Sequence, residues 1–99
     1  MMARIPGHFR ARVAQRLGPH VDVDQLHARI LKSVLTGDDE FCRFALRQSG
    51  DRRVYWFPFE GERRYVVIAR TAQYCHLITI LEPGWSLPRR KASRRKILK

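Results

Sequence analysis

Two stretches in the second half of the chain decide the fold: RYVVIA at residues 64–69 and YCHLITIL at residues 74–81. Both are rich in β-branched and aromatic side chains, and both are apolar at consecutive positions rather than at alternate ones. A strand with this pattern is typical of a sheet that is buried on both faces. We therefore expect these two stretches to be central strands that are covered by other elements.

Two more strands are expected upstream of them. Residues 41–48 alternate between apolar and polar or small side chains, which indicates a half-exposed strand whose apolar face is formed by Cys42, Phe44 and Leu46. Residues 54–59 (VYWFPF) are aromatic and β-prone, and Pro58 favours the end of a strand or the edge of a sheet. Turn signals at residues 49–51 and 60–62 separate the strands, so the sequence predicts a four-stranded antiparallel meander.

Two helices are expected before the strands. Residues 7–17 repeat an apolar side chain every fourth position, at Phe9, Val13 and Leu17, and Gly18-Pro19 ends the helix. Residues 22–36 have a broad apolar face, with a capping-box variant at Asp22 and Gln25 and a left-handed stop at Gly37. The predicted fold class is α+β, with two N-terminal helices packed on one face of a four-stranded antiparallel sheet.

The positive charge is concentrated at the C-terminus. The 99-residue chain has a formal charge of +11, and residues 89–99 contain seven basic and no acidic side chains, which leaves +4 for the other 88 residues. We expect one domain over residues 1–82 and a basic, flexible tail over residues 83–99 that orders on a polyanion. The tail residues expected to contact RNA phosphates are Arg89, Arg90, Lys91, Arg94, Arg95 and Lys96.

Several classes of protein are disfavoured. No apolar run approaches the roughly 18–20 residues that a membrane span needs, and residues 1–7 lack the apolar stretch of a secretory signal. Cys42 and Cys75 lie in apolar surroundings, as expected of reduced thiols in a cytoplasmic protein. The four histidines are not spaced as metal ligands, and no Gly-rich phosphate loop is present. We expect no cofactor, no metal and no membrane partner.

The strongest candidate site is a stripe on the first helix. His8, Arg12 and Arg16 recur at every fourth position, about 100° from the apolar stripe. An imidazole can transfer protons near neutral pH, and guanidinium groups can bind a phosphodiester and stabilise charge on its oxygens. These are the groups that metal-free RNA cleavage needs. The alternative is that the stripe is an ordinary solvated face of a helix in a basic protein.

Four segments together resemble a known superfamily. They are GHFRARVAQR at residues 7–16, the second helix ending at Gly37, the hairpin strand RVYWF at residues 53–57, and the closing strand LITIL at residues 77–81. This combination is similar to the barnase, EndoU, colicin and RelE superfamily of small RNase toxins, which are common in phages, prophages and toxin modules. The resemblance covers about residues 7–81.

The resemblance implies a metal-independent endoribonuclease toxin that acts on RNA. His8 would be the general acid or base, Arg12 or Arg16 would bind the scissile phosphate, and Thr79 would hydrogen-bond a phosphate oxygen or the attacking hydroxyl. Arg70 and Tyr55 are further RNA-binding candidates; the alternatives are that Arg70 only ends its strand and that Tyr55 only packs. His76 is three residues from Thr79, so the two point to opposite faces and cannot line one pocket unless a bulge intervenes, and Thr79 is preferred.

Two alternatives stay open. In the first, the protein is a non-catalytic binder of nucleic acid, in which aromatic side chains stack on bases while arginines hold phosphates. The residues concerned are Trp56, Phe57, Tyr65, Tyr74, Arg43, Arg47 and Arg64. In the second, a phage-type protein uses its positive charge to bind and inhibit an acidic host protein. An antitoxin is the protein partner expected if the chain is a toxin.

Overall fold

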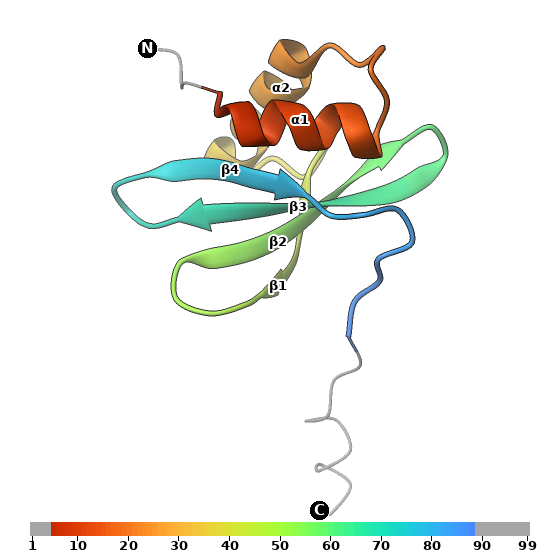
Figure 1. Ribbon diagram of the computed structural model, residues 1–99. Coiled ribbons are helices and arrows are strands. Elements are labelled where there is room, and N and C mark those ends of the chain that lie inside the picture. The colour runs from red at the N-terminus through yellow and green to blue at the C-terminus, as the bar shows by residue number, and fades with distance from the viewer. Residues whose placement is uncertain (1–4, 89–99) are drawn as a thin grey trace, which may run out of the picture.

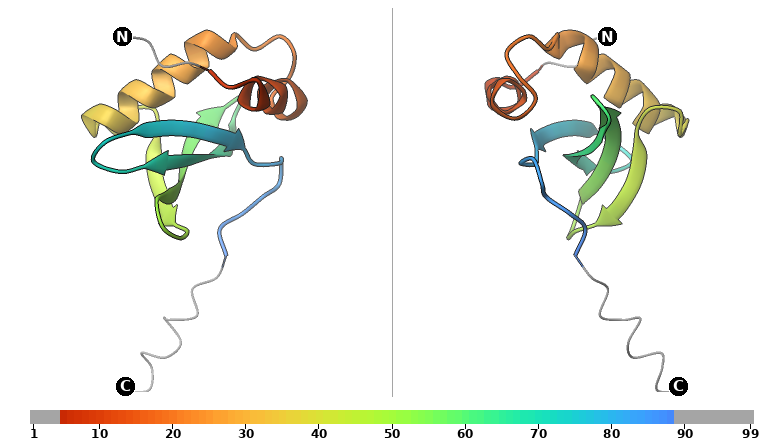
Figure 2. Two further views of the ribbon diagram at one scale, coloured as in Figure 1. Left: turned by 60° about the vertical axis from the view of Figure 1, so that its left-hand side comes forward. Right: turned by 90° about the vertical axis from the view of Figure 1, so that its right-hand side faces the viewer.

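The computed structural model describes residues 5–88 (Figure 1). Its elements are α1 (Gly7–Arg16), α2 (Val23–Thr36), β1 (Arg43–Arg47), β2 (Arg52–Phe59), β3 (Glu62–Arg70) and β4 (Cys75–Ile80). The strands form one antiparallel sheet in the order β1-β2-β3-β4, and both helices lie on one face of it (Figure 2). The predicted α+β fold is confirmed. The RNA-contacting residues predicted at 89–96 lie outside the described residues.

The two helices form where the sequence predicts them. The apolar stripe of α1 is buried, with Phe9 and Val13 fully covered and Leu17, the C-cap, 6% exposed. In α2 the Asp22 side chain accepts a hydrogen bond from the backbone N–H of Gln25 at 3.1 Å, and Gly37 ends the helix at a φ of 73°. Neither helix is both long enough and apolar enough to cross a bilayer.

The main core lies between the helices and the sheet. The side chains of β2, β3 and β4 that face the helices are almost completely buried, and these are Tyr55, Phe57, Val66, Ile68, Leu77 and Ile80. They pack against the apolar stripes of α1 and α2. Burial of this continuous apolar surface is the main force that holds the helices on the sheet.

The prediction that residues 74–81 form a central strand is wrong, because β4 is an edge strand that pairs only with β3. One of its faces is covered by α1, and the other joins a second apolar cluster through Ile78. A strand needs packing partners on both faces to be apolar throughout, but it does not need a neighbouring strand on both sides. The apolar sequence at residues 74–81 therefore predicted correctly that the strand is covered on both faces, but not that it lies at the edge of the sheet.

The alternation predicted for residues 41–48 is broken by a bulge in β1. The pairing with β2 shifts register between Phe44 and Leu46: Phe44 is opposite Tyr55 and Leu46 is opposite the adjacent residue Val54, so Ala45 is an extra residue in β1. Phe44, opposite Tyr55, is 55% exposed and its ring forms a T-shaped pair with the Tyr55 ring, whereas the shift turns Leu46 to the sheet face that the helices do not cover. The sequence pattern alone does not show this shift, because a bulge depends on the partner strand.

The face of the sheet opposite the helices has an apolar cluster of its own. Val54, Tyr65 and Val67 are buried there, and six partly buried side chains pack around them: Ala45, Leu46, Trp56, Ile78, Leu81 and Trp85. The segment after β4 returns to this face, where the N–H of Leu81 donates to the Tyr65 carbonyl and the Trp85 ring lies 4.8 Å from the Tyr65 ring. Packing along the chain thus continues as far as Trp85.

Candidate functional site

A bulge in β4 places His76 and Thr79 on the same face of the sheet. His76 is opposite Ala69 and Thr79 is opposite Val67, and these two residues of β3 share the face away from the helices. The register shifts between Leu77 and Thr79, so Ile78 is the extra residue. Regular alternation would point His76 and Thr79 to opposite faces, and the bulge is the exception that brings them to the same face.

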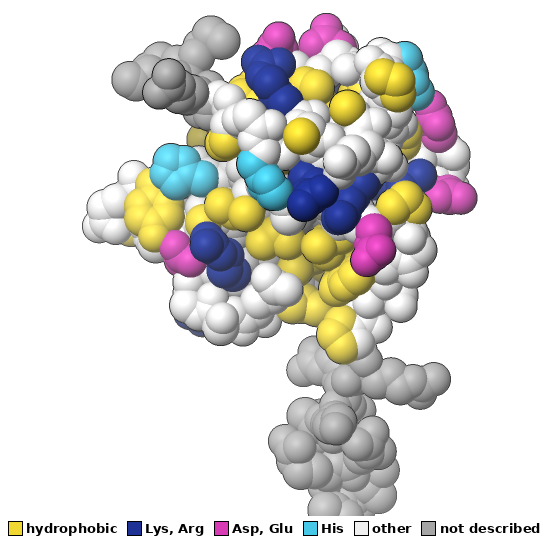
Figure 3. All heavy atoms as spheres, in the orientation of Figure 1, with side chains coloured by type: hydrophobic (Ala, Val, Ile, Leu, Met, Phe, Trp, Pro, Cys, Tyr) yellow, Lys and Arg dark blue, Asp and Glu magenta, His cyan; other side chains and the backbone are white. Residues whose placement is uncertain are grey.

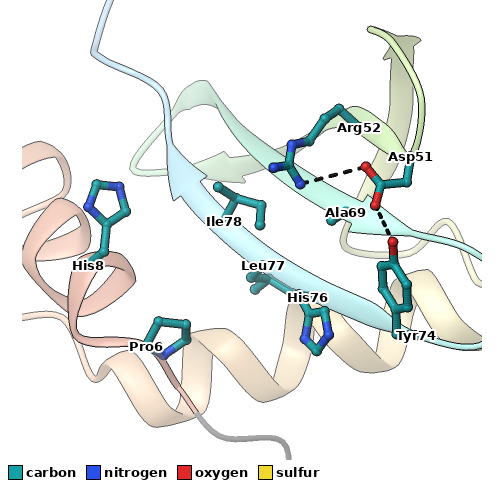
Figure 4. Close-up of a pocket in the computed structure, with 9 residues that line it drawn as sticks. All are labelled: Pro6, His8, Asp51, Arg52, Ala69, Tyr74, His76, Leu77 and Ile78. Carbon is teal, nitrogen blue, oxygen red and sulfur yellow. Dashed lines mark hydrogen bonds and ion pairs between the residues drawn. The ribbon is translucent and has the colours of Figure 1, made fainter.

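A hollow of about 500 Å³ opens beside this bulge (Figure 4). It is bounded by the start of α1, the turn before β2, the end of β3 and the first half of β4. The residues lining it are Pro6, His8, Asp51, Arg52, Ala69, Tyr74, His76, Leu77 and Ile78. Segments that are far apart in the sequence thus meet at one surface depression, which is the usual setting of a binding or active site.

Two imidazoles line the hollow from different elements. His8 projects from the first turn of α1 and His76 from β4, and both side chains are exposed (Figure 4). The His76 ring stacks on Tyr74, with ring centroids 5.1 Å apart and planes 24° apart. Within residues 5–88, neither imidazole is hydrogen-bonded to another side chain. Their nitrogens are therefore available to exchange protons with a bound molecule.

The far wall of the hollow is held by a hydrogen bond between Tyr74 and Asp51. The Tyr74 hydroxyl donates to the Asp51 carboxylate, and this bond lowers the pKa of Asp51 and raises that of Tyr74. Arg52 Nη1 lies 3.7 Å from the same carboxylate and is a long ion pair with it. Asp51 therefore stays ionised and Tyr74 protonated, and together they fix the ring on which His76 stacks.

The basic stripe predicted on α1 exists, but only its first residue reaches the hollow. Arg12 Nη1 donates to Gln15 Oε1 at 2.6 Å, and Arg16 Nη1 donates to the Ile80 carbonyl at 2.9 Å, at the opposite end of β4. Thr79, whose hydroxyl lies 3.4 Å from the same carbonyl, is not among the residues lining the hollow. Figure 3 shows histidine and basic side chains in a row between the helices and an apolar patch over the sheet.

Arg70 and Tyr55 lie on the other side of the sheet, under α2. Arg70 Nη1 donates to the Val34 carbonyl at 2.9 Å and to the Tyr55 hydroxyl at 3.4 Å, and Tyr55 is 8% exposed. Both residues hold the C-terminal end of α2 on the sheet. The RNA-binding role predicted for them stays a prediction, and the structure shows a structural role for each.

Four residues of the hollow were not predicted to belong to the site. His76 was set aside in favour of Thr79, Tyr74 was named only as a base-stacking candidate, and Arg52 and Asp51 were not singled out. One signal for them was present: Tyr74 and His76 are two residues apart on a strand, so their rings share a face. The consecutive apolar residues Leu77 and Ile78 also break strict alternation where the bulge occurs. The turn at residues 49–51 reaches the hollow only through the register of β2, which no local pattern shows.

Other reactive groups do not contribute to the hollow. Cys42 and Cys75 are free thiols, and burial raises the pKa of Cys42 to about 12 and also raises that of Cys75, so both stay protonated near neutral pH. Among residues 5–88, no group of three or more His, Cys, Asp or Glu side chains is placed to hold a metal ion. The chemistry that these described residues offer at the hollow is that of imidazole, guanidinium and phenol.

Comparisons with known proteins leave the site to be interpreted from its own residues. No protein-family model, curated protein or solved structure matches the chain.

Proposed function

We propose that this protein is a metal-independent endoribonuclease whose acid and base are His8 and His76. The observation that carries the proposal is that two exposed imidazoles, from α1 and β4, line one hollow together with Arg52. An imidazole acts as a base when it is neutral and as an acid when it is protonated. Such a pair can remove one proton and supply another in the same reaction.

In the proposed reaction, the neutral imidazole takes the proton of an RNA 2′-hydroxyl, and the 2′-oxygen attacks the adjacent phosphorus. The bond from phosphorus to the 5′-oxygen breaks, and the imidazolium donates its proton to that leaving oxygen. The products are a 2′,3′-cyclic phosphate and a 5′-hydroxyl end, and the imidazole and imidazolium exchange protonation states. Arg52 supplies positive charge for the phosphate oxygens as negative charge accumulates on them.

The start of α1 also favours an anion at the hollow. Its N-cap is Pro6, which has no side chain to accept a hydrogen bond from the first N–H groups, and the first turn contains no acidic residue. The partial positive charge at this end of the helix is therefore not neutralised by a cap or a carboxylate within α1. Pro6 and His8 both line the hollow, so a phosphate there would be attracted to this end of the helix.

The direct test is cleavage of single-stranded RNA by the purified full chain in excess EDTA, with the new ends identified chemically. We expect 2′,3′-cyclic phosphate and 5′-hydroxyl ends, and a loss of roughly 10²- to 10⁴-fold in rate for His8→Ala and for His76→Ala. His20→Ala is the matched control, because His20 is also an exposed histidine but lies beside Glu60, outside the hollow. Cleavage that needs a divalent metal, or that survives both substitutions, would overturn the proposal.

The biological role that we propose is that of a toxin. The resemblance to small RNase toxins and the charge of +11 support it, and an acidic antitoxin is the partner that this role implies. Expression of the wild-type chain in a bacterial host should arrest growth, and expression of His8→Ala to the same level should not. Equal growth of the two cultures would count against a toxin that acts through this site.

A further inference from the structure

A second feature of the exposed sheet face is Trp56 between two arginines. The Arg63 guanidinium lies 4.2 Å from the centre of the indole ring and the Arg43 guanidinium lies 5.6 Å from it. Arg43 is directly opposite Trp56 in the pairing of β1 with β2, and Arg63 is diagonal to it across the pairing of β2 with β3. The three side chains therefore come from three adjacent strands and form one surface cluster.

The two arginines of this cluster keep their charge available. Among residues 5–88, neither Arg43 nor Arg63 pairs with a carboxylate, and the hydrogen bond that Arg43 makes goes to the backbone carbonyl of Asp39. Both side chains are exposed, and Trp56 is half-buried. Both guanidinium groups lie over the indole ring, so a base can stack there when a guanidinium moves from the ring to a phosphate. An aromatic ring with arginines that pair with no carboxylate is a combination that binds single-stranded nucleic acid in this way.

The cluster is continuous with other parts of the chain that suit this ligand. Trp56 is opposite Tyr65 across the pairing of β2 with β3, and the Tyr65 ring contacts the Trp85 ring. In the sequence, the basic residues at 89–99 begin four positions after Trp85. Figure 3 shows apolar side chains gathered over the sheet on the side from which the C-terminal segment leaves.

The cluster and the hollow lie on one path along the sheet. Arg52 lines the hollow, and Trp56 is four residues further along β2 on the same face. At about 3.3 Å per residue the two positions are about 13 Å apart, a distance that a few nucleotides can span. In a duplex the bases are stacked inside and cannot reach the indole, so only an unpaired strand can occupy the hollow and the cluster together.

We propose that Trp56, flanked by Arg43 and Arg63, stacks on an unpaired base and so makes single-stranded RNA the preferred ligand. The inference rests on the proposed function in taking RNA as the substrate of the hollow. It adds a second contact point outside the hollow, and it assigns to Trp56 the selection of unpaired over paired RNA.

Indole fluorescence tests the proposal without any need for catalysis. The chain has two tryptophans, so Trp85→Phe leaves Trp56 as the single indole, and His8→Ala in the same chain suppresses cleavage. We expect saturable quenching by a short single-stranded oligoribonucleotide, and little quenching by the matching duplex or by heparin, which offers negative charge without bases. Equal quenching by heparin, or none by single-stranded RNA, would overturn the proposal, and the second result would leave an acidic protein as the alternative ligand of this face.

Affinity provides an independent measure. Loss of one stacked base corresponds to roughly 5- to 150-fold weaker binding, which we expect for Trp56→Leu, whereas Trp56→Phe keeps a ring and should bind within a few-fold of the parent. Unfolding of each variant, followed by circular dichroism, shows that the domain is folded in the assay. Unchanged affinity in folded Trp56→Leu would contradict the proposal. The two proposals are tested by separate measurements. A chain that does not cleave RNA but whose Trp56 fluorescence is quenched by it contradicts only the proposed function, and a chain that cleaves RNA without this quenching contradicts only the role of Trp56.

Discussion

Arg16 is predicted from the sequence to bind phosphate, but in the structure it fastens α1 to the sheet. Its Nη1 donates to the carbonyl of Ile80, the last residue of the edge strand β4, at 2.9 Å. We predict that Arg16→Met, which keeps most of the apolar stem, destabilises the domain because this bond is lost. A hydrogen bond from a charged donor contributes about 1.5–3 kcal/mol.

The lower end of that range applies here. The bond is only partly buried, and the freed carbonyl lies on an edge strand where water can reach it. The expected loss is therefore about 1.5 kcal/mol, which for a domain of this size corresponds to a decrease in Tm of roughly 6–12 °C. The assay is thermal and urea unfolding of the full chain followed by circular dichroism.

Arg12→Met is the matched control for Arg16→Met. It removes the same charge from the same stripe of α1, but the Arg12 side chain bonds only to exposed Gln15. We expect its unfolding free energy to change by less than about 0.5 kcal/mol. Equal Tm values for the two variants would refute the reasoning, because the effect would then come from charge rather than from the bond to Ile80.

Three further predictions concern groups elsewhere in the molecule. Burial lowers the pKa of His27 below its usual 6.5, so near that pH the folded state binds fewer protons than the unfolded state. The free energy of unfolding should therefore fall as the pH drops below about 6.5, and urea titrations of His27→Gln should show a weaker dependence on pH. Because its pKa is raised to about 12, Cys42 should resist iodoacetamide in the folded protein and react after unfolding; rapid labelling of native Cys42 would contradict the burial. Deletion of residues 89–99, with their seven basic side chains, should reduce the salt dependence of RNA binding, measured as the slope of log affinity against log salt concentration. An unchanged slope would exclude these residues from phosphate contacts.

The parts of the fold that depend on local sequence were predictable. The spacing of Phe9, Val13 and Leu17 identified the buried face of α1, and Asp22 and Gly37 identified the ends of α2. These signals depend on residues within a few positions of one another. The same is true of the turns that separate the strands, and the order of the elements fixes the meander.

The site was only half predictable, because it depends on register between strands. His8 was identified from the helix, but its proposed partner His76 was set aside on the assumption of regular alternation in β4. The bulge at Ile78 is produced by pairing with β3, and the sequence of β4 alone does not specify it. Arg16 was predicted to bind phosphate from its spacing with His8 and Arg12. Its bond to Ile80 joins residues 64 positions apart in the chain, and no local pattern shows it.

The central claim is that His8 and His76 act as one acid and base pair, and a double-mutant cycle on RNA cleavage tests it most directly. The quantity is kcat/KM for the wild type, His8→Ala, His76→Ala and the double variant, all measured in EDTA. Groups that act as a unit give strongly non-additive losses, so the double variant should be about as slow as the slower single variant. Losses that multiply, or full activity in either single variant, would contradict the pairing of the two imidazoles.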